Sequence, residues 1–338
     1  MGTGYEYLVG QFANDAGHTA QEFYTNRTVV TLMAQILRPA PGESIYDPTC
    51  GSGGMLIKSL DYLKSQGLEY RSVRVYGQEV NPITSAIARM NLYLHGVTEF
   101  SIQKGDTLAD PKFIRNGRLA RFNVVLANPP YSIKTWDRER FAHDVWSRNI
   151  LGTPPQGRAD YAFIQHILAS MDETDGRCAI LLPHGVLNRL EEREMRAELV
   201  KLDWLDCILG IGKNLFFNSP MEACVLIANR NKPASHRGKV LFVAAKHLVE
   251  RKNGESYLTD DHIRLLAKTY HDFETVEGLA TVVTNETIRE QKNSLAVNRY
   301  VKCSKDASTE LDLQGAYDTW CHASQVMDAT VAEFAKFV

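Results

Sequence analysis

The chain has 338 residues, a length that favours one large domain with appendages over several separate domains. Apolar residues make up 44% and charged residues 23%, an ordinary globular composition with enough apolar surface for a sizeable core. The 38 basic and 40 acidic side chains give a net charge of −2, which excludes the strongly basic class of DNA-binding proteins that act alone. If the chain acts on DNA, a partner or a local basic surface must therefore supply much of the phosphate attraction.

Six cysteines are spread along the chain without the close pairs of zinc ribbons or redox motifs, which predicts buried, reduced thiols. No stretch approaches the length and apolarity of a membrane span, and the first residues lack a basic region followed by a long apolar run. We therefore expect a cytoplasmic protein that needs no membrane partner.

The part of the chain from Ser44 to about Asn231 alternates short apolar runs with helical patterns. This alternation predicts an α/β fold with a doubly wound, mainly parallel, Rossmann-like sheet. The strands are expected at 44–47, 74–79, 100–103, 122–127, 178–183, 205–211 and 222–228. The last two are close in sequence, so we predict a hairpin strand there rather than a crossover. A helix beginning near Pro82 is expected to bury Ile83, Ile87, Met90 and Leu94.

Residues 132–160 contain two tryptophans and five basic side chains, which predicts a long functional loop rather than core. The basic residues are Lys134, Arg138, Arg140, Arg148 and Arg158. After about residue 235 the pattern weakens, with one more strand possible at 240–245 and a short helix at 260–270. We place a domain boundary there, between 1–235 and a C-terminal helical extension at 236–338. The extension ends in an amphipathic pattern over 319–337 that needs a surface to pack against.

The first strand leads into a glycine-rich turn, DPTCGSGG, at residues 47–54. Glycines at a strand-to-helix turn let the backbone approach a ligand, and the following helix offers free N–H groups. The order differs from the GxGxxG of dinucleotide binders, because the acid Asp47 precedes the glycines and can face a cationic ligand. Taken alone, the element also fits a tight turn without a ligand.

Two further acids follow the next two strands. Glu79 ends the strand at 74–79, where a carboxylate can accept hydrogen bonds from the two hydroxyls of a ribose. Asp106 lies in the segment GDTL, where it can accept from an adenine amino group while Leu108 packs on the ring. Either acid could also be a solvated strand end. Three acids at three successive strand ends together favour an adenosine-containing ligand.

The segment NPPY, at residues 128–131, follows the apolar strand at 122–127. Two prolines make the turn rigid and leave the carbonyl of Pro129 free to accept, and the Asn128 side-chain oxygen is a second acceptor. Two acceptors on one NH2 group can hold its lone pair toward an electrophile, and Tyr131 offers a face for stacking. An ordinary Pro-Pro turn capped by Asn is the alternative.

The segments EFYTNRTVVTLM, DPTCGSGGMLI, GQEVNP, GDTL and NPPY, in this order, resemble N6-adenine DNA methyltransferases. More narrowly, together with YEYLVGQFANDAGHTAQEFYT, DYAFIQHIL, LPHGVLNR, NLFF and NRYV, they resemble the modification subunits of type I restriction-modification systems. The resemblance covers most of residues 5–301. Two features depart from the family: Asn26 stands where Pro is usual, and family members usually carry a large helical domain before this point.

The resemblance implies that S-adenosylmethionine is the cofactor and that residues 1–235 form the catalytic domain. The cofactor-binding residues implied are Glu22, Phe23, Tyr24, Thr25, Asn26, Arg27, Asp47, Gly51, Ser52, Gly53, Gly54, Glu79, Asp106 and Leu108. The residues implied to hold the target adenine are Asn128, Pro129, Pro130 and Tyr131, with Phe216 or Phe217 stacking on the other face of the base. The partners implied are double-stranded DNA, a DNA-specificity subunit that the terminal helix helps to dock, and a restriction subunit.

The expected mechanism is direct in-line transfer to adenine N6, without a metal or a covalent enzyme intermediate, onto a base flipped out of the duplex. An amino-group methyltransferase acting on protein glutamine or on RNA is an alternative, because an amide NH2 poses the same problem. A non-catalytic, DNA-binding scaffold subunit is another. The segment FYT and the basic loop after NPPY favour DNA, and the intact NPPY argues against a scaffold.

Overall fold

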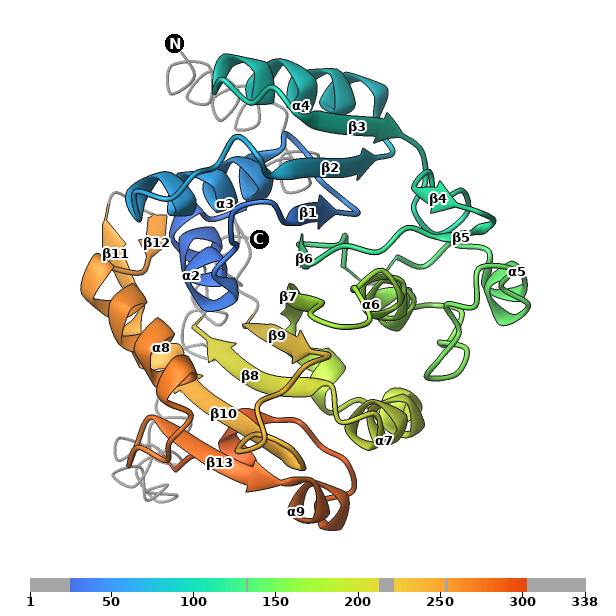
Figure 1. Ribbon diagram of the computed structural model, residues 1–338. Coiled ribbons are helices and arrows are strands. Elements are labelled where there is room, and N and C mark those ends of the chain that lie inside the picture. Colours follow the sequence, from blue (N-terminus) through green and yellow to red (C-terminus); the bar gives the residue numbers. More distant parts are fainter. Residues whose placement is uncertain (1–24, 132, 213–221, 253–254, 303–338) are drawn as a thin grey trace, which may run out of the picture. The chain divides into compact units, whose positions relative to one another are not determined.

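A computed structural model describes residues 25–131, 133–212, 222–252 and 255–302 (Figure 1). The chain divides after Val301 into two units, and of the second, residues 302–338, only Lys302 is described. The amphipathic pattern at 319–337 therefore lies outside the described residues.

A nine-stranded sheet forms the centre of the described part of the first unit, in the order β13-β10-β8-β9-β7-β6-β1-β2-β3. Neighbouring strands are parallel except where β9 or β13 takes part, which confirms the doubly wound, mainly parallel fold. The predicted hairpin strand is also confirmed, because β9 runs antiparallel to β8 and inserts between β8 and β7. The strands are β1 (Ser44–Asp47), β2 (Arg74–Glu79), β3 (Phe100–Lys104), β6 (Val124–Ala127), β7 (Arg177–Pro183), β8 (Leu205–Ile211), β9 (Ala223–Asn229), β10 (Lys239–Ala245) and β13 (Ala280–Thr284).

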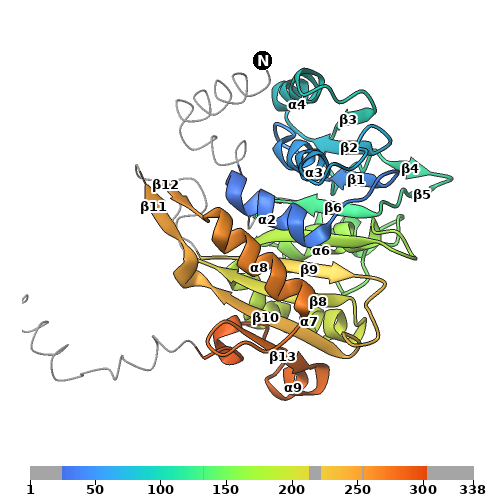
Figure 2. The ribbon, with the colours of Figure 1, turned by 60° about the vertical axis from the view of Figure 1, so that its left-hand side comes forward.

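Helices cover both faces of the sheet. Figure 2 shows α2, α3 and α8 over one face and α6 and α7 over the other. The helices are α2 (Arg27–Leu37), α3 (Gly54–Ser65), α4 (Pro82–Leu94), α5 (Arg138–Ala142), α6 (Asp160–Ala169), α7 (Arg193–Lys201), α8 (Asp260–Asp272) and α9 (Asn285–Glu290). Two short hairpins lie outside the sheet, formed by β4 (Ile114–Arg115) with β5 (Arg118–Leu119) and by β11 (Glu250–Lys252) with β12 (Glu255–Tyr257).

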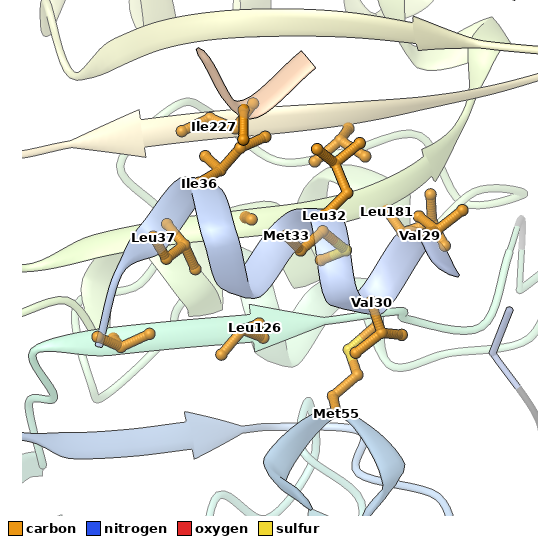
Figure 3. Packing of buried hydrophobic residues seen from close by; sticks show 14 of the residues in the cluster. Val29, Val30, Leu32, Met33, Ile36, Leu37, Met55, Leu126, Leu181 and Ile227 are labelled. Atoms are coloured by element: carbon orange, nitrogen blue, oxygen red, sulfur yellow. The ribbon is translucent and has the colours of Figure 1, made fainter. Parts of the chain in front are cut away.

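Helix α2 begins directly after Asn26 and packs its apolar side chains into the core. Asn26 caps it by accepting the N–H of Thr28 at 3.0 Å, and Arg38 ends it in a left-handed conformation. Its buried side chains lie between the sheet and α3, where Val30 meets Met55 and the opposite side faces strands β6, β7 and β9 (Figure 3). Because the cap and the apolar face agree, α2 begins at a defined place directly after Asn26.

The buried face expected for α4 is wrong. Ile83 and Met90 are 71% and 50% exposed, and the helix instead buries Thr84, Ser85, Ala88, Asn91 and Leu92. The reason is the close approach of the glycine turn: a Cβ at Gly53 would lie 3.7 Å from Ala88, and Asn91 donates to the carbonyl of Ser52 at 3.0 Å. Only small or hydrogen-bonding side chains fit against that backbone, so proximity to the turn outweighs apolar periodicity.

The sheet continues past residue 235, because β10 and β13 pair at its edge next to β8. The strand expected at 240–245 and the helix expected at 260–270 correspond to β10 and α8. The boundary that we placed at residue 235 therefore does not follow the sheet, which is continuous within the unit 1–301.

The segment that we predicted to be a loop rather than core is partly core. The side chains of Arg148 and Asp144 are each 1% exposed and form an ion pair of 2.6 Å, and Phe141 and Leu151 are buried. The sequence does not predict that Arg148 is buried, because its hydrogen-bond partners include the carbonyls of Thr107 and Leu108 in another segment.

Candidate functional site

Three carboxylates lie at the carboxyl ends of adjacent parallel strands. Asp47 ends β1, Glu79 ends β2, and Asp106 follows β3 by two residues. Parallel pairing aligns Asp47 with Gly77 on β2 and Glu79 with Lys104 on β3, so the strand ends lie side by side. The three predicted acids therefore share the edge at which α/β sheets bind ligands.

The glycine-rich turn is held against the end of β2 by its backbone. The N–H of Cys50 donates to the carbonyl of Gln78 at 2.9 Å, and the N–H of Gly51 donates to Oε2 of Glu79 at 3.0 Å. Gly53 has a φ of 81°, a left-handed conformation that favours glycine, and it is the N-cap of α3. Because Gly53 supplies no side chain to cap α3, the first N–H groups of the helix can serve a ligand.

A second glycine allows the turn to approach the sheet. A Cβ at Gly77 would lie 2.6 Å from Cδ1 of Ile102 and 2.9 Å from Sγ of Cys50. Any larger residue at Gly77 would push the turn away from β2 and would separate the groups around Glu79.

Asp47 is a buried carboxylate, 2% exposed, whose Oδ1 accepts the N–H of Thr49 at 2.9 Å. Burial raises its pKa from 3.8 to about 7, the bond from Thr49 opposes that shift, and the charge of Glu79 adds to it. A cationic ligand beside Asp47 would relieve both the desolvation and the repulsion, so this site favours a positively charged group.

Glu79 and Asp106 each use backbone N–H groups to fix their orientation. Oε1 of Glu79 accepts the N–H of Asn81 at 2.8 Å, while Oδ1 of Asp106 accepts the N–H groups of Leu108 and Ala109 at 2.8 and 3.1 Å. A carboxylate oxygen has a second lone pair, and Oδ2 of Asp106 takes part in neither of these two bonds. Both acids are thus oriented acceptors, suited to hydroxyl and amino donors of a ligand.

Sequence reasoning missed two residues near these acids. Gln78 is fully buried, donates to the carbonyl of Asp110 at 3.0 Å and accepts the N–H of Lys112 at 2.9 Å, so it holds the segment after β3. Val80 directly follows Glu79 and is 62% exposed, which leaves an apolar surface beside the acid. A polar residue inside an apolar strand is the signal that could have identified Gln78.

The NPPY turn is joined to the residue before α2 by hydrogen bonds. Nδ2 of Asn128 donates to the hydroxyl of Thr25 at 3.0 Å, and the hydroxyl of Tyr131 donates to Oδ1 of Asn128 at 2.7 Å. These bonds fix the Asn128 amide with its oxygen partly available as an acceptor. The Asn128 side chain therefore contacts Thr25 and Tyr131 as well as offering an acceptor to a target amine.

The four residues of this turn are buried or half-buried. Pro129 is buried, and no hydrogen bond within the described ranges uses its carbonyl oxygen. Burial raises the pKa of the Tyr131 phenol well above 10, and the charge of Asp160 contributes, so the hydroxyl stays protonated and can donate. The turn therefore presents fixed, uncharged hydrogen-bonding groups.

Of the other implied cofactor residues, Asn26 is occupied as the cap of α2 and donates to the carbonyl of Ser256 at 2.7 Å. Arg27 begins α2. Several candidates lie outside the described residues: Glu22, Phe23, Tyr24, Phe216 and Phe217.

The thiols of the described part of the chain are free and buried, as predicted, at Cys50, Cys178, Cys207 and Cys224. None of the helices in the described ranges has the length and apolar character needed to cross a membrane.

Comparison with known proteins gives consistent results. The model of the family N-6 DNA Methylase matches residues 1–309. The HindI type I restriction enzyme methylase subunit of Haemophilus influenzae is 31% identical over 89% of this chain and 68% of its own length. The MjaVII type I restriction enzyme methylase subunit of Methanocaldococcus jannaschii is 33% identical over 89% of this chain and 52% of its own length.

A crystal structure of a type I restriction-modification methyltransferase subunit from Streptococcus thermophilus superimposes with a TM-score of 0.80 and 32% identity, over 89% of this chain and 63% of that one. The chain thus spans between about half and two thirds of the length of such relatives. With the family match extending over residues 1–309, the chain belongs to the N-6 DNA methylase family.

Proposed function

We propose that the chain binds S-adenosylmethionine and transfers its methyl group to N6 of an adenine flipped out of double-stranded DNA, as part of a type I modification subunit. The observation that carries the proposal is the arrangement of Asn128, held by Thr25 and Tyr131, at the sheet edge that also presents Asp47, Glu79 and Asp106. The methylase relatives support the same reaction.

The chemistry of the acids fits this cofactor. Its cationic methionyl end suits the buried carboxylate of Asp47, its ribose hydroxyls suit the oriented oxygens of Glu79, and its adenine amino group suits Asp106. Val80, which directly follows Glu79, offers an exposed apolar surface. When bound, S-adenosylmethionine supplies a methyl group already activated by a sulfonium centre.

The residues of the NPPY turn orient the acceptor. Oδ1 of Asn128 and the carbonyl of Pro129 accept the two hydrogens of the target NH2, which directs the nitrogen lone pair toward the methyl donor. Correct positioning of this kind can supply roughly 7–11 kcal/mol of the barrier reduction. No strong base is needed, because the amine becomes acidic only as the new bond forms.

A flipped base must be held after it leaves the duplex, which costs a few kcal/mol of stacking and pairing. The Tyr131 ring can offset part of this by stacking. The bond from its hydroxyl to Asn128 fixes the ring relative to the amide, so one residue orients both the base plane and its acceptor.

Methyl transfer to protein glutamine or to RNA uses the same amine chemistry and is the alternative function that the NPPY turn alone would also fit. The link between Asn128 and Thr25 favours DNA, because Thr25 belongs to the FYT segment that the DNA enzymes share. A scaffold without activity would not need the fixed amide of Asn128.

The test is a transfer assay with labelled S-adenosylmethionine and equal masses of duplex DNA, RNA and protein extract, with and without a DNA-specificity subunit. We expect label in DNA that digests to N6-methyladenine, and none with Asn128→Ala. Label in RNA or protein instead of DNA would overturn the substrate assignment, and no cofactor binding at all would overturn the reaction.

A DNA-specificity subunit and a restriction subunit are the proposed partners.

A further inference from the structure

The buried ion pair of Asp144 and Arg148 belongs to a larger hydrogen-bond network. Every N–H of the Arg148 guanidinium has an acceptor. Nε and Nη2 donate to Oδ1 of Asp144 at 3.0 and 2.6 Å, Nη2 donates to the carbonyl of Leu108 at 2.8 Å, and Nη1 donates to the carbonyl of Thr107 at 2.9 Å. The fifth N–H donates to Nδ1 of His166 at 3.3 Å.

The contact with His166 fixes the protonation of that ring. A guanidinium can only donate, so Nδ1 of His166 accepts and the ring proton is on Nε2, which donates to the Tyr46 hydroxyl at 3.2 Å. Burial, followed by the charge of Arg148, lowers the pKa of His166 well below 6.5, which agrees with a neutral ring. Tyr46 immediately precedes Asp47, so the network reaches the end of β1.

Two parts of the molecule meet at Arg148. One is the segment after β3, where Thr107 also donates to the carbonyl of Pro48 at 2.5 Å and where Asp106, the residue proposed to hold the cofactor adenine, accepts the N–H of Leu108. The other is the loop that follows the NPPY turn. Its Trp146 ring lies 4.8 Å from the guanidinium carbon, and Phe141 lies 5.4 Å away.

We propose that Arg148 is a positioning residue that holds the Asp106–Leu108 segment in its cofactor-binding shape and couples that segment to the loop at 138–151. The proposal rests on the proposed function, which gives Asp106 to the cofactor adenine. Because the coupling is reciprocal, cofactor binding at one side orders the loop at the other. Lysine at this position would keep the charge, but a single ammonium cannot reach all the acceptors that the planar fork serves.

The experiment compares Arg148→Lys with Arg264→Lys in the full chain. The control changes an arginine that also pairs with an aspartate, Asp261, but is 70% exposed on α8. We expect Arg148→Lys to raise the Kd for S-adenosylmethionine at least tenfold by calorimetry, while Arg264→Lys stays within twofold of wild type. Circular dichroism first establishes that each variant is folded.

Hydrogen exchange of the wild-type chain provides a readout that does not depend on any variant folding. In wild type, saturating cofactor should slow amide exchange at 105–110 and also at 138–151, although no residue of 138–151 is assigned to the cofactor. In Arg148→Lys at saturating cofactor, slowing should persist at 105–110 and disappear at 138–151. A wild-type loop that does not respond to cofactor, or an Arg148→Lys chain that binds as tightly as wild type, would overturn the coupling.

The Glu79→Ala variant distinguishes a failure of the cofactor assignment from a failure of the role given to Arg148. If wild type binds the cofactor, Glu79→Ala weakens binding and Arg148→Lys does not, the proposed function stands and the role of Arg148 fails. If wild type does not bind, or Glu79→Ala binds like wild type, the cofactor assignment fails, and the role of Arg148 fails with it because no pocket remains to be positioned.

Discussion

Replacing Asp47 with asparagine should make the cofactor-free protein more stable and its cofactor affinity lower. The side chain is 2% exposed, and burial raises its pKa from 3.8 to about 7. Asparagine keeps an oxygen that can accept the N–H of Thr49, but it never becomes charged. The substitution therefore removes the buried charge and leaves most of the local geometry.

The size of the effect follows from the shift in pKa. A rise in the pKa of Asp47 from 3.8 to about 7, at ~1.36 kcal/mol for each step of one in pKa, corresponds to about 4 kcal/mol. Because the folded pKa of Asp47 is raised, its contribution to stability is fully present below pH 3.8 and is lost as the pH rises through about 7. Between pH 5 and pH 8 the wild type should lose about 2–3 kcal/mol that the Asp47→Asn variant keeps.

Cofactor binding should change in the opposite direction. A cationic ligand prefers the ionised carboxylate, so wild-type affinity should rise with pH until Asp47 is ionised, by up to about tenfold per unit below pH 7. The Asp47→Asn variant should bind more weakly and lack this rise. Urea unfolding from pH 5 to pH 8 and calorimetry over the same range measure the two effects.

Asp61→Asn on α3 is the control, because Asp61 is partly exposed and pairs only with surface lysines. A surface pair of this kind is worth about 1 kcal/mol or less, and its loss should be small. Parallel stability–pH curves for wild type and Asp47→Asn would show that the Asp47 carboxylate is not a desolvated charge, and the reasoning would then be wrong.

Three further predictions concern the roles given to other parts of the chain. Glu79→Ala should weaken cofactor binding at least tenfold in a folded protein, with Glu99→Ala, at an exposed glutamate, as control; unchanged calorimetric affinity would contradict the assignment. Asn128→Ala should abolish methyl transfer and leave the cofactor Kd within about threefold, so appreciable turnover would refute its role. Deletion of residues 310–338 should impair assembly with a specificity subunit, which size-exclusion chromatography of the mixture would detect.

The strand-end acids could be placed from the sequence, because in a parallel sheet the position of an acid along its own strand determines the sheet edge at which it lies. An acid at the end of a parallel strand, or just after it, must lie at the carboxyl edge of the sheet, and Asp47, Glu79 and Asp106 do. The buried face of α4 could not be placed in this way. Ala88 and Asn91 are buried because they pack against the backbone of a turn 35–40 residues earlier in the sequence. A helical period does not predict that contact.

The role of Arg148 was hidden for the same physical reason. Its partners come from Asp144 in the same loop, from residues 107–108 after β3 and from His166 in α6, so only the assembled fold identifies it as buried. In the sequence it was one more basic residue beside a tryptophan, typical of a nucleic-acid surface. A buried arginine whose N–H groups all have acceptors within the protein cannot bind a phosphate as a solvated arginine can.

The remaining cations of the long loop are also not equivalent. Arg138 donates from Nε to the carbonyl of Pro154 at 2.8 Å, and Arg158 lies 3.7 Å from Glu191. Both bonds hold a guanidinium against the protein and reduce its freedom to follow a phosphate. The loop therefore presents less usable positive charge than its composition indicates.

Lys134 and Arg140 are exposed, although the guanidinium carbon of Arg140 lies 5.7 Å from the centre of the Trp146 ring. Arg138 and Arg158 would first have to leave their partners, so the described loop offers two to four cations for phosphates. At about −0.9 per phosphate contact, two to four contacts give a slope of log K against log salt of only about −2 to −4. We expect fluorescence anisotropy with the isolated chain and duplex DNA to give such a slope, with little preference among sequences. A slope steeper than about −6, or selective methylation of one site by the chain alone, would contradict the need for a separate DNA-specificity subunit.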